Sequence, residues 1–354
     1  SGYNNTTADN NTAVGYNSLY TNTTGTDNAA LGKEALLANT TGDSNTAVGV
    51  QALRENTTGG ANVSVGAVAL DANTTGSDNT AIGVHALGSN TTANYNVAVG
   101  RDSLKTNTTG TENVAVGTLA LDASTTANYN VAVGYSAGSA ITTGSENIMM
   151  GGNAGLALTT GAQNVLLGRS AGAGNNMSFN TFVGDLSGQN TSGNSNTYVG
   201  YSTNSSSSGA NNTIIGNDGA PSSSSVSNEI TLGNGSIGTL RCHQQTISSL
   251  SDERDKTDIV DLPYGLDFIN KTRPVQFVWN MRDNPDSPKQ GKTRNGFIAQ
   301  ELLALGNNEQ HDLVLEENPE KLEAAYSALL PMLTKAVQEL SAKVEELESK
   351  LNGE

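Results

Sequence analysis

The sequence predicts a mainly β protein: a parallel β-solenoid or triple β-helix of 16–17-residue repeats, then a small α+β domain that ends in a coiled-coil helix. The first observation is a glycine that closes a short β-like block every 17 residues, or every 16 in some later repeats. The second is an asparagine four residues before that glycine in thirteen of fourteen repeats, the exception being Glu229. The third is a sharp rise in charge density after residue 250. A fixed period of this length is typical of a repeat architecture. The glycines are Gly15, Gly32, Gly49, Gly66, Gly83, Gly100, Gly117, Gly134, Gly151, Gly168, Gly184, Gly200, Gly216 and Gly233.

Each repeat carries the chemistry of one coil. The residue before the glycine is a large aliphatic such as Val14, and the residue two positions earlier shares its strand face. We expect both to be buried. A second apolar anchor such as Leu19 follows the glycine by four residues, and turns such as 22–25 supply positive φ through Asn and Gly. One repeat therefore predicts a coil of two short strands and two turns, with the fixed asparagines forming a ladder along the stack.

The middle strand position changes along the chain. It is small in the early repeats and large later, and we interpret it as pointing away from the coil core, as the contact between neighbouring chains. The alternative is a hydrophobic column beneath another strand of the same coil. The column reads Ala13, Ala30, Ala47, Ser64, Ala81, Ala98, Ala115, Ala132, Met149, Leu166, Phe182, Tyr198 and Ile214.

Composition divides the chain into two domains. Residues 1–250 hold 6 basic and 14 acidic residues, whereas the following 104 residues hold 12 and 20. We predict a repeat stalk over 1–244 and a second domain over 245–354. Its tail, 328–352, has apolar residues at alternating spacings of three and four, which predicts a coiled coil rather than a helix lying on a core. These are Leu330, Leu333, Val337, Leu340, Val344, Leu347 and Leu351.

Two motifs in the second domain resemble a known family. The opening Ser-Asp-Glu-Arg-Asp-Lys at 251–256 and the block Asn-Gly-Phe-Ile-Ala-Gln-Glu at 295–301 are similar to the C-terminal intramolecular chaperone auto-processing domain of phage tail spikes and fibres, the peptidase S74 family. The repeats over 11–233 resemble the heads of trimeric bacterial adhesins. The first resemblance implies a homotrimer whose C-terminal domain drives folding and then cuts itself off.

That resemblance also assigns the site. It implies Ser251 and Lys256 as the catalytic pair, with the cut between Ser251 and Asp252. A serine needs a base to act as a nucleophile, and a lysine can be that base when burial favours its neutral form. Five residues of separation do not bring the two side chains together on a helix, so we expect a turn or a neighbouring chain to do so. The expected activity is single-turnover autoproteolysis without an external substrate.

Other classes of site are not expected. A single cysteine, Cys242, and three scattered histidines, His85, His243 and His311, argue against a metal centre, and no motif calls for a cofactor. The net charge of −16 argues against a nucleic-acid partner. No run of 18 apolar residues is present, so we expect no membrane insertion.

The predicted function is that of a phage tail fibre or spike. It would be made in the host cytoplasm, reside in the virion tail as a homotrimer, and bind a host cell-surface receptor, a glycan or an outer-membrane component. Two alternatives stay open: a bacterial surface trimeric adhesin, against which the missing secretion signal argues, and an ice-binding solenoid, suggested by the threonine pairs stacked every 17 residues.

Overall fold

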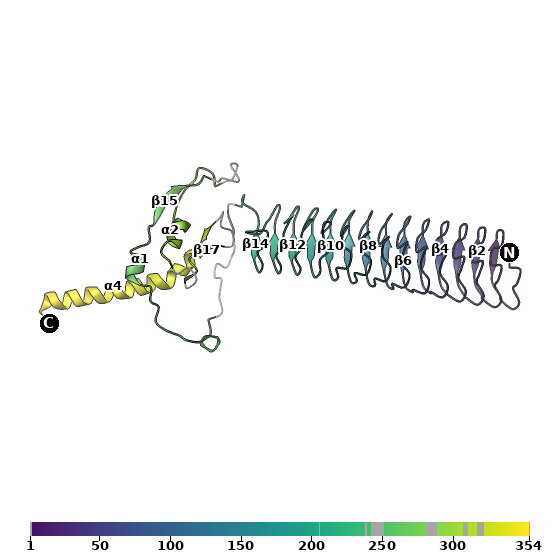
Figure 1. Ribbon diagram of the computed structural model, residues 1–354, viewed down its shortest axis with the longest axis horizontal. Helices are drawn as coiled ribbons and strands as arrows, with labels where there is room; N and C mark the ends of the chain where they lie inside the picture. The colour runs from purple at the N-terminus through teal and green to yellow at the C-terminus, as the bar shows by residue number, and fades with distance from the viewer. Residues whose placement is uncertain are drawn as a thin grey trace. The chain divides into compact units, whose positions relative to one another are not determined.

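The structure is a computed structural model that describes residues 2–204, 206–237, 239–241, 251–280, 289–306, 311–316 and 322–353. Two compact units are present, Ser1–Asn234 and Gly235–Glu354 (Figure 1). The predicted domain boundary at 244–245, together with Cys242 and His243, lies outside the described residues.

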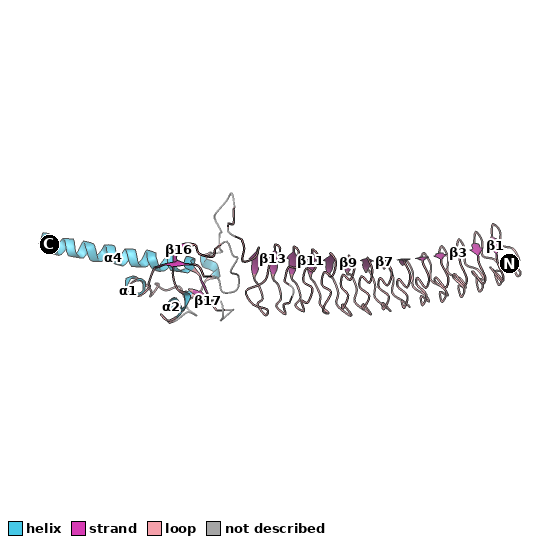
Figure 2. Cartoon of the chain, turned by 90° about the horizontal axis from the view of Figure 1, so that it is seen from above, coloured by secondary structure: helices cyan, strands magenta, loops and turns pink. Residues whose placement is uncertain are grey.

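The first unit is a single-chain parallel β-solenoid. Each coil contributes one strand of three residues, and the fourteen strands pair in chain order, so that Val97 lies opposite Val114 and Val99 opposite Val116. Because each strand pairs with the next coil of the same chain, the solenoid reading is confirmed over the intertwined one (Figures 1 and 2). Each coil forms one strand, whereas the sequence predicted two. The strands are β1 Thr12–Val14, β2 Ala29–Leu31, β3 Thr46–Val48, β4 Val63–Val65, β5 Thr80–Ile82, β6 Val97–Val99, β7 Val114–Val116, β8 Val131–Val133, β9 Ile148–Met150, β10 Val165–Leu167, β11 Thr181–Val183, β12 Thr197–Val199, β13 Thr213–Ile215 and β14 Ile230–Leu232.

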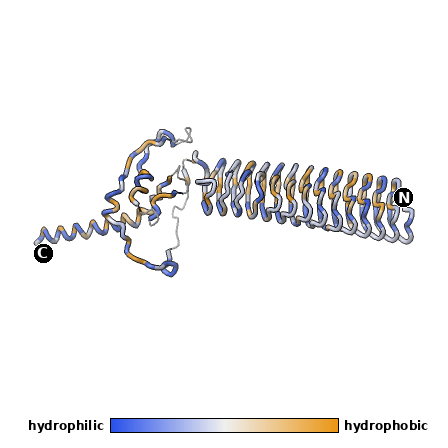
Figure 3. Tube along the Cα trace, viewed as in Figure 1, coloured by the Kyte–Doolittle hydropathy of each residue, from blue (hydrophilic) through white to orange (hydrophobic). Residues whose placement is uncertain are grey.

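The core lies under the middle residue of each strand. Ala47, Ala98 and Tyr198 are all fully buried within the single chain, and the anchors equivalent to Leu36 are buried beside them. Hydrophobic segments recur from coil to coil in Figure 3. The interpretation of the alanine column as a contact between chains is therefore wrong, and the alternative, a column inside the coil, is correct. Phe182 and Tyr198 stack within it at 4.7 Å between ring centroids.

The residues that flank the middle position face outward. Val14 is 55% exposed and Leu31 is 52% exposed, although the sequence analysis placed such residues in the core. A three-residue strand directs one side chain to one face and two to the other. The narrow interior of the coil takes the single one, which is why that position begins as alanine.

The asparagine ladder is confirmed. At Asn79 the backbone N–H donates to Asn62 Oδ1 at 3.0 Å, and Nδ2 donates to Ala93 O at 2.8 Å. In turn Asn79 Oδ1 accepts from the backbone N–H of Asn96 at 3.0 Å. A second ladder joins the turn asparagines, in which Asn73 Nδ2 donates to Asn56 Oδ1 at 2.9 Å. Both ladders are buried, so they satisfy backbone groups that water does not reach.

Positive φ occurs at other positions than predicted. Within the Asn-Thr-Thr-Gly turns neither the Asn nor the Gly adopts it. Instead Gly83 has φ +136°, and a Cβ placed there would lie 2.5 Å from the carbonyl oxygen of Gly100 in the next coil. The close approach of successive coils, rather than a tight turn alone, explains the glycine period.

The second unit is small and contains short elements with one long helix (Figure 2). β15 pairs antiparallel with β16, and β17 with β18. A small core forms around Leu302, Leu313, Val314, Leu329 and Met332. The elements are η1 Glu253–Asp255, α1 Leu266–Ile269, β15 Val275–Val278, β16 Thr293–Gly296, α2 Ala299–Leu303, β17 Val314–Leu315, β18 Glu323–Ala324, η2 Tyr326–Ala328 and α4 Leu329–Asn352.

Helix α4 has two parts. Its beginning is anchored in this unit, because Leu329, Met332 and Ala336 are buried and Glu339 Oε2 accepts the backbone N–H of Leu266 at 2.8 Å. The apolar residues of the predicted coiled coil all lie exposed, with Leu340 half exposed. The helix is as long as predicted, while its coiled-coil pairing stays a prediction.

Candidate functional site

The site is built on a single turn of 3-10 helix, η1, which begins two residues after Ser251. Asp252 is its N-cap: its carboxylate accepts the backbone N–H of Arg254 at 2.9 Å. The N–H of Asp255 donates to Asp252 O at 3.2 Å, and the N–H of Lys256 donates to Glu253 O at 3.1 Å. A cap of this kind satisfies donors that a short helix leaves without partners.

The turn brings Ser251 and Lys256 together. Lys256 Nζ donates to Ser251 Oγ at 2.7 Å and lies 3.3 Å from the backbone oxygen of Ser251. That oxygen belongs to the peptide bond between Ser251 and Asp252. A five-residue separation unsuited to a helix is thus closed by one tight turn within a single chain.

Electrostatics hold the turn in place. The Arg254 guanidinium donates from Nε at 2.9 Å and from Nη2 at 2.6 Å to the two carboxylate oxygens of Asp252. These side-chain hydrogen bonds, and then the backbone N–H of Arg254, lower the pKa of Asp252, and the same contact raises the pKa of Arg254. The resemblance placed Asp252 at the cut and gave Arg254 no role, although Asp is one of the residues preferred at an N-cap.

The dyad is open to solvent. Ser251 and Lys256 are both exposed in the single chain, and Asp252 is partly covered. Serine–lysine chemistry works best where water is excluded and the neutral amine is favoured. The single chain therefore brings the two side chains into contact but does not enclose them.

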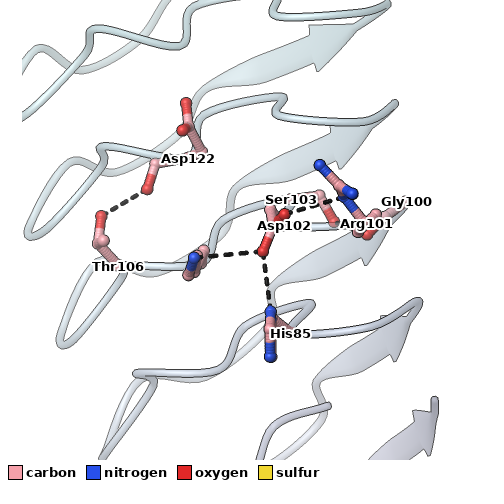
Figure 4. Close-up of polar contacts among 8 residues, drawn as sticks. His85, Gly100, Arg101, Asp102, Ser103, Thr106 and Asp122 are labelled. Carbon is pink, nitrogen blue, oxygen red and sulfur yellow. Dashed lines mark hydrogen bonds and ion pairs between the residues drawn. The ribbon is translucent and has the colours of Figure 1, made fainter. Parts of the chain in front are cut away.

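A second polar cluster lies on the solenoid (Figure 4). Asp102 Oδ1 lies 3.0 Å from His85 Nδ1 and 3.3 Å from Lys105 Nζ, and Arg101 Nε lies 3.1 Å from Oδ2. Burial raises the pKa of Asp102, but the hydrogen bonds from His85 and Lys105 outweigh it, so the pKa is lowered. Among the described residues no group of three or more His, Cys, Asp or Glu side chains could hold a metal ion. We regard this cluster as links between neighbouring coils.

An apolar groove of about 660 Å³ lies in the second unit, between the end of α1, strands β15 and β16 and the start of α4. Pro274, Phe297, Tyr326 and Leu333 are among its lining residues. Beside it Arg273 pairs with Glu301 of α2, with Nε 2.9 Å from Oε2. Its lining contains no Ser, Cys, His, Lys, Asp or Glu, and we assign it no catalytic residue.

Comparison with known proteins finds a family match within the second unit. Residues 251–311 match the family described as chaperone of endosialidase. The match begins at Ser251 and therefore includes the whole of the capped turn. The search of curated proteins found no match, and neither did the search of solved structures. No helix among the residues that the structure describes is long and apolar enough to cross a membrane.

Proposed function

We propose that the chain is the homotrimeric stalk of a phage tail fibre or spike, which binds a host receptor and whose chaperone domain is removed by self-cleavage after assembly. One observation carries the proposal: Lys256 Nζ contacts Ser251 Oγ at 2.7 Å where the chaperone match begins, beyond a long repetitive solenoid. The match to a chaperone family also supports this proposal, because a chaperone acts while chains fold and associate.

A stack of near-identical coils needs such a chaperone. Three chains that assemble side by side can slip by one coil, since each coil offers almost the same surface as the next. The solenoid also lacks a globular nucleus to offset its loss of conformational entropy. Three copies of α4 would fix the register, because the exposed residues Leu333, Leu340 and Leu347 form an unpaired apolar seam in the single chain.

We propose cleavage of the bond between Ser251 and Asp252, with water as the attacking group. Neutral Lys256 takes a proton from water through the Ser251 hydroxyl, while the resulting hydroxide attacks the carbonyl carbon of Ser251. The lysine, now an ammonium 3.3 Å from that carbonyl oxygen, stabilises the oxyanion. It then gives its proton to the nitrogen of Asp252 as the C–N bond breaks, which leaves a carboxyl group on Ser251 and an amine on Asp252.

Direct attack by Ser251 Oγ on its own carbonyl is disfavoured, because it would close a strained four-membered ring. Attack on the preceding carbonyl would close a five-membered ring and release a fragment that starts at Ser251. The first residue of the released fragment therefore separates the two bonds.

Assembly would provide the missing enclosure. Because the dyad is exposed in one chain, we propose that neighbouring copies cover it and favour the neutral amine, so that cutting follows trimer formation. Loss of the chaperone then removes the route by which the stalk folded, and the stability of the mature stalk becomes kinetic.

Expression of three variants tests this function. Ser251→Ala and Lys256→Ala should give uncut trimers, since neither change removes core volume, whereas Lys271→Ala, an exposed lysine of the same unit, should cleave like wild type. The readouts are a denaturing gel, the sequence of the fragment's first residues and the mass in solution. Wild type that forms trimers but stays uncut would contradict the processing part of the proposal.

The two alternatives stay untested predictions. For ice binding, the structure shows that the first threonine of each pair from Thr6 to Thr142 is engaged, as where Thr57 Oγ1 donates to Thr74 O at 2.9 Å. In most coils the second threonine of the pair, such as Thr58 or Thr75, is the exposed one. Thermal hysteresis in a solution of the full chain would favour ice binding over the fibre.

A further inference from the structure

The outer face of the solenoid sheet is uncharged and mainly aliphatic along its length, with threonine as its only polar residue type. It is formed by the first and third residues of strands β1 to β14, and we call it the sheet face. Its third-residue column holds only Val, Leu, Ile and Met, and its first-residue column holds only Thr, Ala, Val and Ile. Neither column contains a charged residue. Within it Ile82 is 40% exposed and Met150 is 46% exposed, so these side chains contact solvent in the single chain.

The sheet face is large for an uncovered surface. Fourteen strands spaced about 4.8 Å apart give a length of roughly 60 Å, and three residues at about 3.3 Å each give a width of roughly 10 Å. The projected area of about 600 Å² is at the upper end for the largest apolar patch of a monomer. It approaches the roughly 800 Å² per partner of a stable specific interface, before side-chain relief is counted.

The other surfaces of the coils are mixed. The turns carry exposed threonines such as Thr92, and the segments after the glycines carry exposed apolar residues such as Tyr135 as well as the ion cluster around Asp102. The third-residue column of the sheet face, by contrast, is aliphatic in all fourteen coils, although the buried column beneath it changes from Ala47 to Tyr198. Such uniformity is not required by the core, because these side chains point away from it.

We propose that the sheet face packs against the sheet faces of two further copies of this chain. Apart from the threonines of the first-residue column, this surface is aliphatic and uncharged, so it offers a sugar few hydrogen-bonding groups, whereas it matches the identical surface of another copy. A partner that covers the whole sheet face needs a surface that repeats with the same period, coil by coil. A second copy of the chain has such a surface. The glycine column that follows the third residues carries no side chains, so it adds no bulk directly beside the third-residue column.

This inference rests on the proposed homotrimer and adds the surface through which it forms. The sequence pattern suggested the alanine column as the contact between chains. Because that column is buried, we assign the contact to the two residues that flank it on each strand. In a threefold assembly the same residue of each copy lies at the same level, so identical positions of the sheet face meet across the axis. A receptor would then bind the turns or the other outer surfaces of the coils.

Cysteine cross-linking of the full chain tests the assignment. In a Cys242→Ser background, Val97→Cys and Val99→Cys place thiols on the two columns of one coil, and Thr92→Cys places one on the turn of the same region. With a short bifunctional thiol reagent, we expect at least one of the valine variants to give covalently linked chains within the trimer, and the threonine variant to give none.

A charge variant gives the second readout. Val99→Asp should lower the yield of soluble trimer at least tenfold, and the matched Thr92→Asp should leave it within twofold. Should Val99→Asp fail to fold, the cysteine variants decide, since they are small and uncharged. A trimer that cross-links only through Thr92→Cys, or that tolerates Val99→Asp, overturns the assignment of the sheet face as the interface and leaves the proposed function standing. A monomeric wild-type chain overturns both, whereas an uncut trimer cross-linked through Val97 or Val99 overturns only self-cleavage.

Discussion

Replacing one ladder asparagine should destabilise the solenoid by a predictable amount. In Asn79→Ala the buried N–H of Asn96 loses its acceptor, Asn79 Oδ1, and a buried donor without a partner costs about 1–3 kcal/mol. The 2.8 Å bond from Asn79 Nδ2 to Ala93 O is also lost, at about 1 kcal/mol net. Ala93 O keeps the bond from Asn90, and Asn62 Oδ1 keeps the backbone N–H at position 79. We therefore expect a loss of about 2–4 kcal/mol per chain.

The measurement is guanidinium unfolding of the full chain, followed by hydrogen exchange at the amide of residue 96. Thr75→Ala is the matched control, because Thr75 is exposed in the same coil. Asn79→Asp keeps the acceptor but points an oxygen at Ala93 O, so the variant should be more stable in acid, where the carboxyl is protonated and can donate. Equal unfolding of Asn79→Ala and Thr75→Ala, with unchanged exchange at residue 96, would refute the reasoning.

Three further predictions follow from other contacts. Gly83→Ala should lower the melting temperature, because its Cβ would meet the Gly100 oxygen at 2.5 Å at φ +136°; a melting curve equal to that of wild type contradicts this. Leu340→Glu should reduce trimer yield by charging the α4 seam, as measured by light scattering, and an unchanged yield removes α4 from the assembly. Asp252→Asn should slow self-cleavage by weakening the cap. Because the pKa of Asp252 is lowered, its carboxylate is charged at every pH above its ordinary pKa of 3.8. The charge is lost only as the pH falls through the lower pKa of the folded state. Any decline in wild-type cleavage between pH 7 and roughly 5 therefore arises outside the cap, and equal declines in wild type and Asp252→Asn there are the expected result.

The repeat and its ladder were predictable from sequence, but the face of each strand was not. Gly83 is required by the close approach of the next coil, and Asn79 by its buried hydrogen bonds. The period of these two residue types therefore sets the length of one coil. In a strand such as Val97-Ala98-Val99 all three residues are apolar. Alternation therefore cannot tell which face is buried, and the narrow interior decides in favour of the small middle residue.

The sequence singled out Ser251 and Lys256 as a pair but not the geometry that joins them, and their catalytic role stays a prediction. The resemblance assigned Ser251 and Lys256, whereas their contact depends on a 3-10 turn whose cap, Asp252, is held by Arg254. A single turn of this kind has almost no periodicity in sequence, so the spacing of five residues suggested distance rather than contact.

Native mass spectrometry of the freshly expressed full chain tests the central claim most directly, because it reports assembly and cleavage in one spectrum. The account predicts a trimer of residues 1–251 together with a separate fragment of residues 252–354, and in Ser251→Ala a trimer of the intact 36.4 kDa chain. An intact monomer as the only species of the wild-type chain would contradict it.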